Sequence, residues 1–293
     1  QLFAAEAIGP THNKLHPRIS VSGRWIITVY VLITVLCAIA LRFCGMGVFD
    51  SVNHALTTAA TGGFSTKNAS IAYFNSHSVE YVITFFMFLS GINYGLLFFV
   101  IFRGKVHKLI EDTQFKWYLM FLLIFTFIVG VSLFISTPYN GSSALRNALF
   151  HVTAIITTTG FTSTDYTQWP PFIWMTLGLR MYFGACAGST TGGMKSIRIA
   201  ILLKSMRNEF NRILHPNAIL PVRVNGKVIP PSTRQSVLTF SIFFFAMVFI
   251  GWFFYLAIGI DIAEAYGISL SCLSNIGLTI GYHGCNIPWD DMP

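Results

Sequence analysis

Long apolar stretches alternate with short polar ones along this chain. A helix that crosses a membrane needs about 20 apolar residues, because the hydrocarbon core is roughly 30 Å thick. Runs of that length cover residues 25–44, 81–102, 117–136 and 237–260. A fifth run, 172–203, contains the glycine-rich segment 188–193, and we expect two half-helices joined by a non-helical break there. The pattern predicts an all-α membrane protein with several spans.

Composition agrees with this interpretation and excludes a soluble class. Hydrophobic residues make up 54% of the 293 residues and charged residues only 10%, whereas soluble proteins carry about 25% charged residues. The net charge of +8 would favour a nucleic-acid partner in a soluble protein. Here the basic residues lie between apolar runs, so membrane topology explains them and we expect no nucleic-acid partner.

Basic residues also predict the orientation. Fifteen of the 19 Lys and Arg lie in segments that share one side of the membrane, namely 14–24, 103–116 and 195–234. Because cytoplasmic loops are enriched in Lys and Arg, this side is predicted to be cytoplasmic. Segments 45–80, 137–169 and 261–293 are then outside. The stretch 208–232 is polar and rich in proline, which predicts a cytoplasmic linker.

Each outside segment contains the same short unit. A semi-apolar run too short to span ends in a turn that contains Gly63, Gly160 or Gly277, and these glycines lie 97 and 117 residues apart. A polar residue (Asp50, Asn147 or Glu264) stands thirteen positions before each glycine, and His54 and His151 share one register. The chain therefore contains three copies of a repeated element.

The repeated element is predicted to be a re-entrant half-helix followed by a filter turn. Thirteen helical residues rise about 20 Å, which reaches the middle of a bilayer without crossing it. Non-helical backbone at that depth is tolerated where it lines a water-filled cavity. Rings of carbonyl groups in such turns can replace the hydration shell of a monovalent cation. The predicted filter consists of Thr61, Gly62, Gly63, Thr158, Thr159, Gly160, Asn275, Ile276 and Gly277.

Simpler explanations exist for single residues. A glycine in an apolar segment is commonly a helix-packing residue, but three in one register favour a filter. The segment Gly188, Ser189, Thr190, Thr191, Gly192 and Gly193 lacks the spacing of a phosphate-binding loop. It is either a flexible connection or a gate in an ion path, since helices broken within a membrane mark such paths.

The predicted organisation follows from the repeats. We expect a cytoplasmic lead-in at 1–24, a first repeat at 25–103, a cytoplasmic loop at 104–116 and a second repeat with a broken second helix at 117–207. The linker 208–232 then leads to a third repeat at 233–293, which lacks its second span.

Several runs resemble one known family. The runs TTAATGGFST (57–66), TTTGFTSTDYTQWP (157–170), PTHNKLHPRI (10–19) and GSTTGGMKSIR (188–198) are similar to those of the Trk/Ktr/HKT superfamily of potassium transporters, closest to its TrkH-type subunits. The resemblance covers essentially the whole chain. It implies four helix–pore-loop–helix repeats arranged pseudo-fourfold around one pore, with 188–193 as a gate beneath the filter.

The resemblance also implies the biological setting. It implies potassium uptake across a bacterial inner membrane, with rubidium and sodium as further candidate ions and no organic cofactor. The expected partners are the lipid bilayer, a second copy in a homodimer and a TrkA-type cytoplasmic nucleotide-binding regulatory subunit. Three repeats cannot close a fourfold pore, so we expect the native chain to be longer than these 293 residues.

Other polar residues have less specific interpretations. For His54 and His151 we expect hydrogen bonds to neighbouring repeats rather than metal binding. Arg42, Arg146 and Arg180 lie near membrane depth, where charges usually pair, and for Arg180 we expect an acid or carbonyl partner. The basic linker either lies near anionic lipid or docks a cytosolic ring.

Two rival functions remain at the sequence level. A cation-coupled secondary transporter of another solute would need ionisable residues around a central cavity, whereas the repeats offer mainly Thr, Gly and apolar residues. A membrane scaffold or enzyme subunit gives no reason for three matched half-spans, and no catalytic constellation is present in the sequence. We expect that the protein is not an enzyme.

Overall fold

Helices form almost all of the regular structure in the computed structural model, which describes residues 19–215, 217–218 and 220–279. The α-helices are α2 (Ile19–Phe43), α3 (Val48–Ala59), α4 (His77–Ser90), α5 (Tyr94–Arg103), α6 (Val106–Glu111), α7 (Thr113–Ser136), α8 (Gly141–Ile156), α9 (Pro171–Met181), α10 (Ser196–Leu214), α11 (Pro231–Ile258) and α12 (Ile262–Ser274). Short elements are the 3-10 helices η1 (Ser70–Phe74) and η2 (Tyr166–Gln168) and the strands β1 (Arg223–Val224) and β2 (Lys227–Val228). The predicted all-α class is confirmed.

Three of the four uninterrupted spans predicted from the sequence are single long helices. Among the described residues, Gly23–Phe43 of α2, α7 and α11 are each long and apolar enough to cross a membrane. Large apolar side chains remain exposed along them, for example Ile27, Phe127 and Phe253 at 63%, 71% and 65%. Exposed apolar surface on this scale is expected of helices that contact lipid or other membrane segments.

The prediction of one continuous span over 81–102 is wrong. The segment forms α4 and α5, which meet at 105° across a short break. At Gly91 a side chain would collide with the phenol oxygen of Tyr118, since an added methyl group would lie 2.6 Å away. Asn93 then starts α5, because its side-chain oxygen accepts hydrogen bonds from the N–H groups of Gly95 and Leu96. Tertiary contacts therefore bend an otherwise apolar helix.

The predicted break in the second long run is present and is wider than expected. Helix α9 ends at Met181 and α10 starts at Ser196, so 182–195 is non-helical rather than 188–193 alone. The expected linker at 208–232 is partly structured, since α10 continues to Leu214 and β1 and β2 form an antiparallel hairpin. Asn225 and Gly226 form its turn with φ values of 48° and 76°, as two-residue hairpin turns require.

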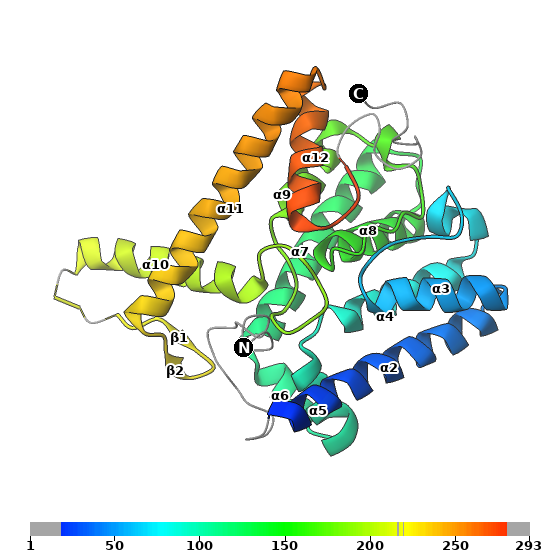
Figure 1. Ribbon diagram of the computed structural model, residues 1–293. Helices are drawn as coiled ribbons and strands as arrows, with labels where there is room; N and C mark the ends of the chain where they lie inside the picture. Colours follow the sequence, from blue (N-terminus) through cyan, green and yellow to red (C-terminus); the bar gives the residue numbers. More distant parts are fainter. Residues whose placement is uncertain (1–18, 216, 219, 280–293) are drawn as a thin grey trace.

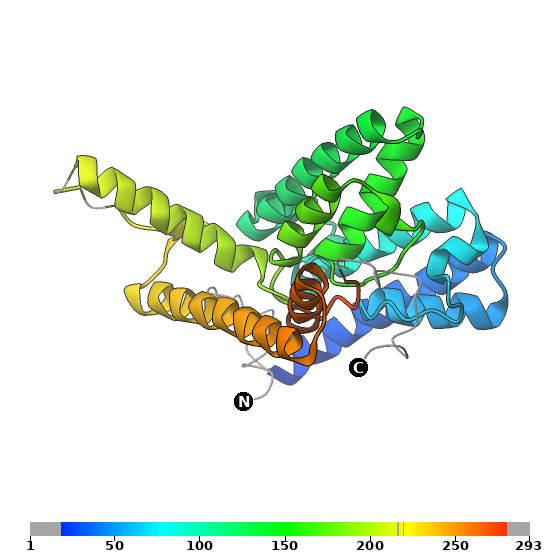
Figure 2. The same ribbon diagram turned by 90° about the horizontal axis from the view of Figure 1, so that it is seen from above.

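The hairpin packs against the rest of the chain. Val222, Val224 and Ile229 are buried in a small apolar cluster with Ile197 and Ile201 of α10. The side chain of Asn225 donates a hydrogen bond of 2.8 Å to the carboxylate of Asp112. The linker is therefore attached at the start of α7. Helix α10 projects to one side of the other helices (Figure 2).

Each short helix lies against the long helix that precedes it. Helix α3 packs on α2, α8 on α7 and α12 on α11. Small residues permit the approach: Gly130 of α7 faces Ala148 of α8, and Gly251 of α11 faces Ser269 of α12. The same helix pair thus occurs three times, and α3, α8 and α12 run toward the middle of the molecule (Figure 1).

Candidate functional site

The three short helices end in the same backbone conformation. Thr61, Thr158 and Asn275, one or two positions after the last helical residue, have φ values of 54°, 52° and 58°. Their N–H groups bond to carbonyls three residues earlier, and the next N–H bonds five residues back, as in Gly62 to Thr57 at 2.7 Å. This is the left-handed cap that glycine or asparagine usually provides. A β-branched threonine there is strained, and strain of this kind concentrates at functional sites.

A second left-handed residue follows two positions later in every turn. Gly63, Gly160 and Gly277 have φ values of 67°, 79° and 85°. Only glycine adopts this conformation without a steric penalty. The intervening residue in each turn does not share it, so the backbone alternates in handedness. Such alternation can turn successive carbonyl groups to one side, which is the arrangement of an ion filter.

Neighbouring turns are in direct backbone contact. A methyl group added at Gly63 would lie 1.7 Å from the carbonyl oxygen of Thr159, and one added at Gly160 would lie 2.0 Å from that of Ile276. In both cases the contacted residue directly precedes the next turn's glycine. The contact between the first and second turns is therefore equivalent to the contact between the second and third turns. At Gly277 no described atom lies within 4 Å of the corresponding position.

The nine residues predicted for the filter thus come together in three adjoining turns. Their threonine hydroxyls are largely occupied within the protein. The hydroxyl of Thr61 donates to the carbonyl of Ala60 at 2.7 Å, and that of Thr158 accepts from the N–H of Gly192 at 2.7 Å. Backbone carbonyls are therefore better candidates for ion contact than these hydroxyls. The carboxyl ends of α3, α8 and α12 add partial negative charge nearby.

The non-helical segment 182–195 lies against the carboxyl ends of all three short helices. The hydroxyl of Thr190 donates to the carbonyl of Ala59 at the end of α3, at 3.1 Å. Gly192 contacts the second turn through Thr158 and approaches the third so closely that an added methyl group would lie 2.6 Å from the carbonyl oxygen of Ser274. A single loop from the second repeat thus contacts the end of each short helix.

Hydrogen bonds at its base hold this loop in shape. The N–H of Gly184 donates to the carbonyl of Met194 at 2.8 Å, and the N–H of Ser196 to that of Ala185 at 3.0 Å. Lys195 donates to the carbonyl and hydroxyl of Thr191. The two ends of the loop are therefore bonded to each other, and the segment between them forms a closed excursion from the broken helix.

The break between α4 and α5 supports the loop from the other side. The side chain of Asn93 donates to the carbonyl of Ala187 at 2.6 Å, and the N–H of Tyr94 donates to that of Gly188 at 3.0 Å. The N–H of Cys186 donates to the carbonyl of Gly91 at 3.1 Å. Two helix breaks therefore bind one another. Sequence reasoning missed this support, although Asn93, two positions after Gly91 in an apolar run, was a usable signal.

The arginines near membrane depth have partners, as predicted. Arg180 is fully buried and donates to the carbonyl of Phe183 at 2.7 Å. Its guanidinium lies 5.1–5.6 Å from the ring centres of Phe121, Phe125 and Phe183, within the range of a cation–π contact. Arg146 forms an ion pair with Glu80 at 2.7 Å, which joins α8 to α4. Arg180 thus holds the point where α9 gives way to the loop.

The hydrogen bonds expected from the two histidines to neighbouring repeats are not the ones observed. His54 bonds to the carbonyl of Asp50 at 2.8 Å and the hydroxyl of Ser65 at 2.9 Å, both in its own repeat. His151 bonds to the carbonyl of Asn147 at 2.9 Å. The link of His54 to the next repeat is instead a stacked ring contact with Phe161, at 5.9 Å. Within the described residues, no group of three or more His, Cys, Asp or Glu could hold a metal ion.

Comparison with known proteins gives consistent matches. The family TrkH, described as cation transport protein, matches residues 9–288. The Trk system potassium uptake protein TrkH of Salmonella typhimurium is 34% identical over 96% of this chain. The protein of the same name from Halomonas elongata is 33% identical over 100% of this chain. The crystal structure of the potassium transporter TrkH from Vibrio parahaemolyticus matches 96% of this chain with a TM-score of 0.88 at 30% identity.

The chain is shorter than these relatives. It spans 59% of the Salmonella protein, 60% of the Halomonas protein and 60% of the Vibrio chain. The family match, over residues 9–288, includes the three turns and the loop described above.

Proposed function

Because this chain belongs to the TrkH family of cation transport proteins, we propose that it takes part in potassium uptake across a membrane, through a filter made by its three glycine turns. Potassium is the transported substrate, with rubidium and sodium as further candidate ions. The activity is transport, and no organic cofactor is required. The family and the apolar helices make the chain an integral membrane protein.

One observation carries this proposal, namely the repeated backbone contact between successive turns. Each turn alternates two left-handed residues with a residue of ordinary conformation. Gly63 and Gly160 each approach the carbonyl of the residue that precedes the next filter glycine. A dehydrated monovalent cation needs several such oxygens at fixed spacing. The proposed ligands are carbonyl oxygens of Thr61-Gly62-Gly63, Thr158-Thr159-Gly160 and Asn275-Ile276-Gly277.

The segment 188–193 is proposed as the gate. It blocks the space at the carboxyl ends of the short helices while its hydrogen bonds to Ala59, Tyr94 and Thr158 persist. Opening would require these bonds to break together with the contact to the third turn. A conformational change of the helix breaks is the natural cause, since α5 and α10 both start at the edge of the loop.

The setting is proposed from the charge distribution and the family. The basic segments, including the linker 208–232, face the cytoplasm of a bacterial cell, and the protein lies in the inner membrane. A TrkA-type nucleotide-binding regulatory subunit docks on that side, and the functional unit is a homodimer. The apolar side chains exposed on the projecting helix α10, such as Phe210 at 65% and Ile213 at 75%, support a partner or lipid contact there.

A matched pair of alanine substitutions tests the filter. Gly160→Ala places a methyl group 2.0 Å from the carbonyl oxygen of Ile276, so one of the two turns must move. Gly226→Ala introduces the same substitution at a similar φ, 76° against 79°, with no atom within 4 Å. Both variants carry comparable backbone strain, and only one disturbs the turns.

The readout is potassium uptake by the full-length protein in cells that lack other uptake systems. We expect Gly160→Ala to lower uptake by roughly tenfold or more, which corresponds to only about 1.4 kcal/mol at the ion path. Gly226→Ala should leave it near the wild-type rate. Wild-type uptake and selectivity in a properly inserted Gly160→Ala variant would refute the filter assignment.

A further inference from the structure

Beyond the first and the second filter turn, the chain forms a second set of hydrogen bonds to the next repeat. In the first repeat, η1 supplies two N–H groups, those of Ile71 and Ala72, which both donate to the carbonyl of Thr162, at 3.0 and 3.2 Å. The N–H of Thr162 in turn donates to the hydroxyl of Ser70 at 3.3 Å. Three hydrogen bonds therefore join the outer segment of the first repeat to the residue just past the second turn.

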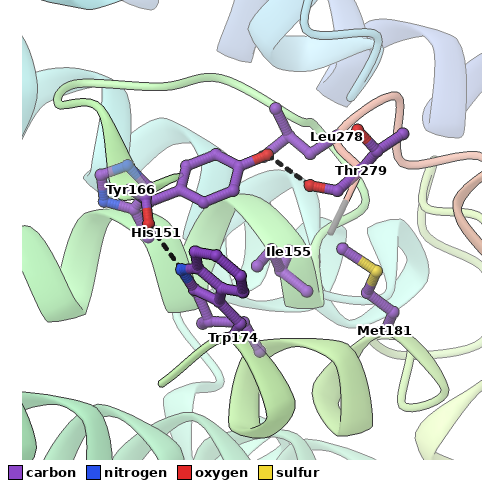
Figure 3. Close-up of a pocket in the computed structure, with 8 residues that line it drawn as sticks. His151, Ile155, Tyr166, Trp174, Met181, Leu278 and Thr279 are labelled. Carbon is purple, nitrogen blue, oxygen red and sulfur yellow. Dashed lines mark hydrogen bonds between the residues drawn. The ribbon is translucent and has the colours of Figure 1, made fainter. Parts of the chain in front are cut away.

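The second repeat makes the corresponding bond to the third. The phenol of Tyr166, in η2, donates to the carbonyl of Thr279 at 2.7 Å. Figure 3 shows the Tyr166 ring reaching from its own segment across to the strip that carries Leu278 and Thr279. The two bonded carbonyls are equivalent, because Thr162 and Thr279 each stand two positions after the turn glycine.

The donors at the two junctions differ in kind, and this difference is informative. Backbone N–H groups bond to Thr162, whereas a side-chain hydroxyl bonds to Thr279. The same carbonyl position is thus bonded by two unrelated groups. A recurrent acceptor with different donors indicates a structural requirement at that position rather than the accident of one side chain.

Tyr166 is fixed at both ends. The indole N–H of Trp174 donates to its carbonyl at 2.9 Å (Figure 3), and its ring packs 5.9 Å from His151 and 6.4 Å from Trp169. Only 5% of the residue is exposed. The cavity that it lines has a volume of only about 10 Å³. The phenol therefore acts as a rigid spacer between repeats.

We propose that these outer bonds, from 70–72 to Thr162 and from Tyr166 to Thr279, set the spacing of neighbouring filter turns and so determine ion discrimination. Tyr166 is a positioning residue for selectivity that does not itself touch the ion. The proposal rests on the filter function proposed above. Two contacts therefore fix neighbouring turns relative to each other: the approach of the turn glycine to the next turn, and the outer hydrogen bond beyond the turn. Whether a filter selects by size or by carbonyl field, discrimination depends on where the oxygens stand.

Tyr166→Phe tests the proposal, because it removes one hydroxyl and keeps the ring. The full-length protein is reconstituted into liposomes, and the fluxes of sodium, rubidium and potassium are compared. We expect the sodium-to-potassium flux ratio to rise roughly three- to tenfold, the range expected from loss of one hydrogen bond, while potassium flux persists. Tyr73→Phe, at a tyrosine that is 60% exposed in the outer segment of the first repeat, serves as control and should leave the ratio unchanged.

A second variant covers the case in which Tyr166→Phe fails to fold. Ser70→Gly removes the hydroxyl that binds Thr162 and relieves a left-handed φ of 51°, so it adds no strain. It should raise the same ratio, by less, because two bonds to Thr162 remain. An unchanged ratio in a folded Tyr166→Phe protein, or in Ser70→Gly if the former does not fold, would overturn the proposal. If Gly160→Ala still lowers uptake, the filter assignment would survive that result.

Discussion

Asn93 offers a direct test of how the loop at 182–195 is held. Its side chain performs two tasks: the oxygen caps α5 through Gly95 and Leu96, and the amide nitrogen donates to the carbonyl of Ala187 at 2.6 Å. Serine is also a good helix cap but cannot reach the loop with a second donor. Asn93→Ser therefore removes the bond to the loop and keeps the cap, whereas Asn93→Ala removes both.

The expected magnitudes follow from these contacts. Loss of the Ala187 bond should destabilise the observed loop conformation by about 1 kcal/mol. That change raises the population of the displaced loop about fivefold. Loss of the cap should cost a further ~1 kcal/mol of helix stability. Both variants should thus raise basal flux by a similar factor, and Asn93→Ala should also have the lower melting temperature.

The assay is passive rubidium uptake into liposomes that contain the full-length protein without any regulatory subunit. Thermal melting in detergent provides the parallel measure of stability. Two results would contradict the reasoning. Basal flux equal to wild type in Asn93→Ser would show that the bond to Ala187 does not restrain the loop. Raised flux in Asn93→Ala alone would assign the effect to the helix cap.

Two further predictions concern the buried charges. Arg180→Lys should lower the melting temperature more than Arg180→Met. A lysine ammonium loses the planar contact with the surrounding phenylalanine rings and stays buried as a charge, whereas methionine removes the charge. Equal melting temperatures of the two variants would contradict this account. Glu80→Gln should destabilise the protein by about 3 kcal/mol, since it leaves the guanidinium of Arg146, whose side chain is only 15% exposed, without its carboxylate. The double change Glu80→Met with Arg146→Met should recover most of that loss in the same melting experiment, and a double variant no better than Glu80→Gln would argue against the ion pair as the cause.

The sequence was sufficient to locate the turns because their signal is local and repeated. Gly63, Gly160 and Gly277 share a register, and each follows a run too short to span. The contact between successive turns could not be predicted. Gly63 meets Thr159, a residue 96 positions away, and no pattern within either run specifies that approach. The left-handed conformation of Thr158 was equally hidden, because threonine ordinarily avoids it.

Helix breaks were predicted where glycines cluster and missed where tertiary contacts cause them. The glycine-rich composition of 188–193 indicates a break, whereas 91–93 lies in an apolar run without proline. Residues 182–187 also look compatible with a helix, yet Gly184 and Cys186 hydrogen-bond elsewhere. The hairpin at 223–228 was predictable from its Asn225-Gly226 pair, but the polarity of the surrounding stretch led to the prediction of a linker.

The head-to-tail contact between turns also constrains how the molecule is assembled. The first turn is completed by backbone from the second repeat, and the second by backbone from the third. A ribosome-bound chain would therefore have inserted α2 and α3 long before their turn acquired its final geometry, since the partner of Gly63 is made 96 residues later. The pore lining therefore forms late in biogenesis. Each of these two turns reaches its final geometry only after the next repeat has been inserted and has supplied the backbone that it contacts.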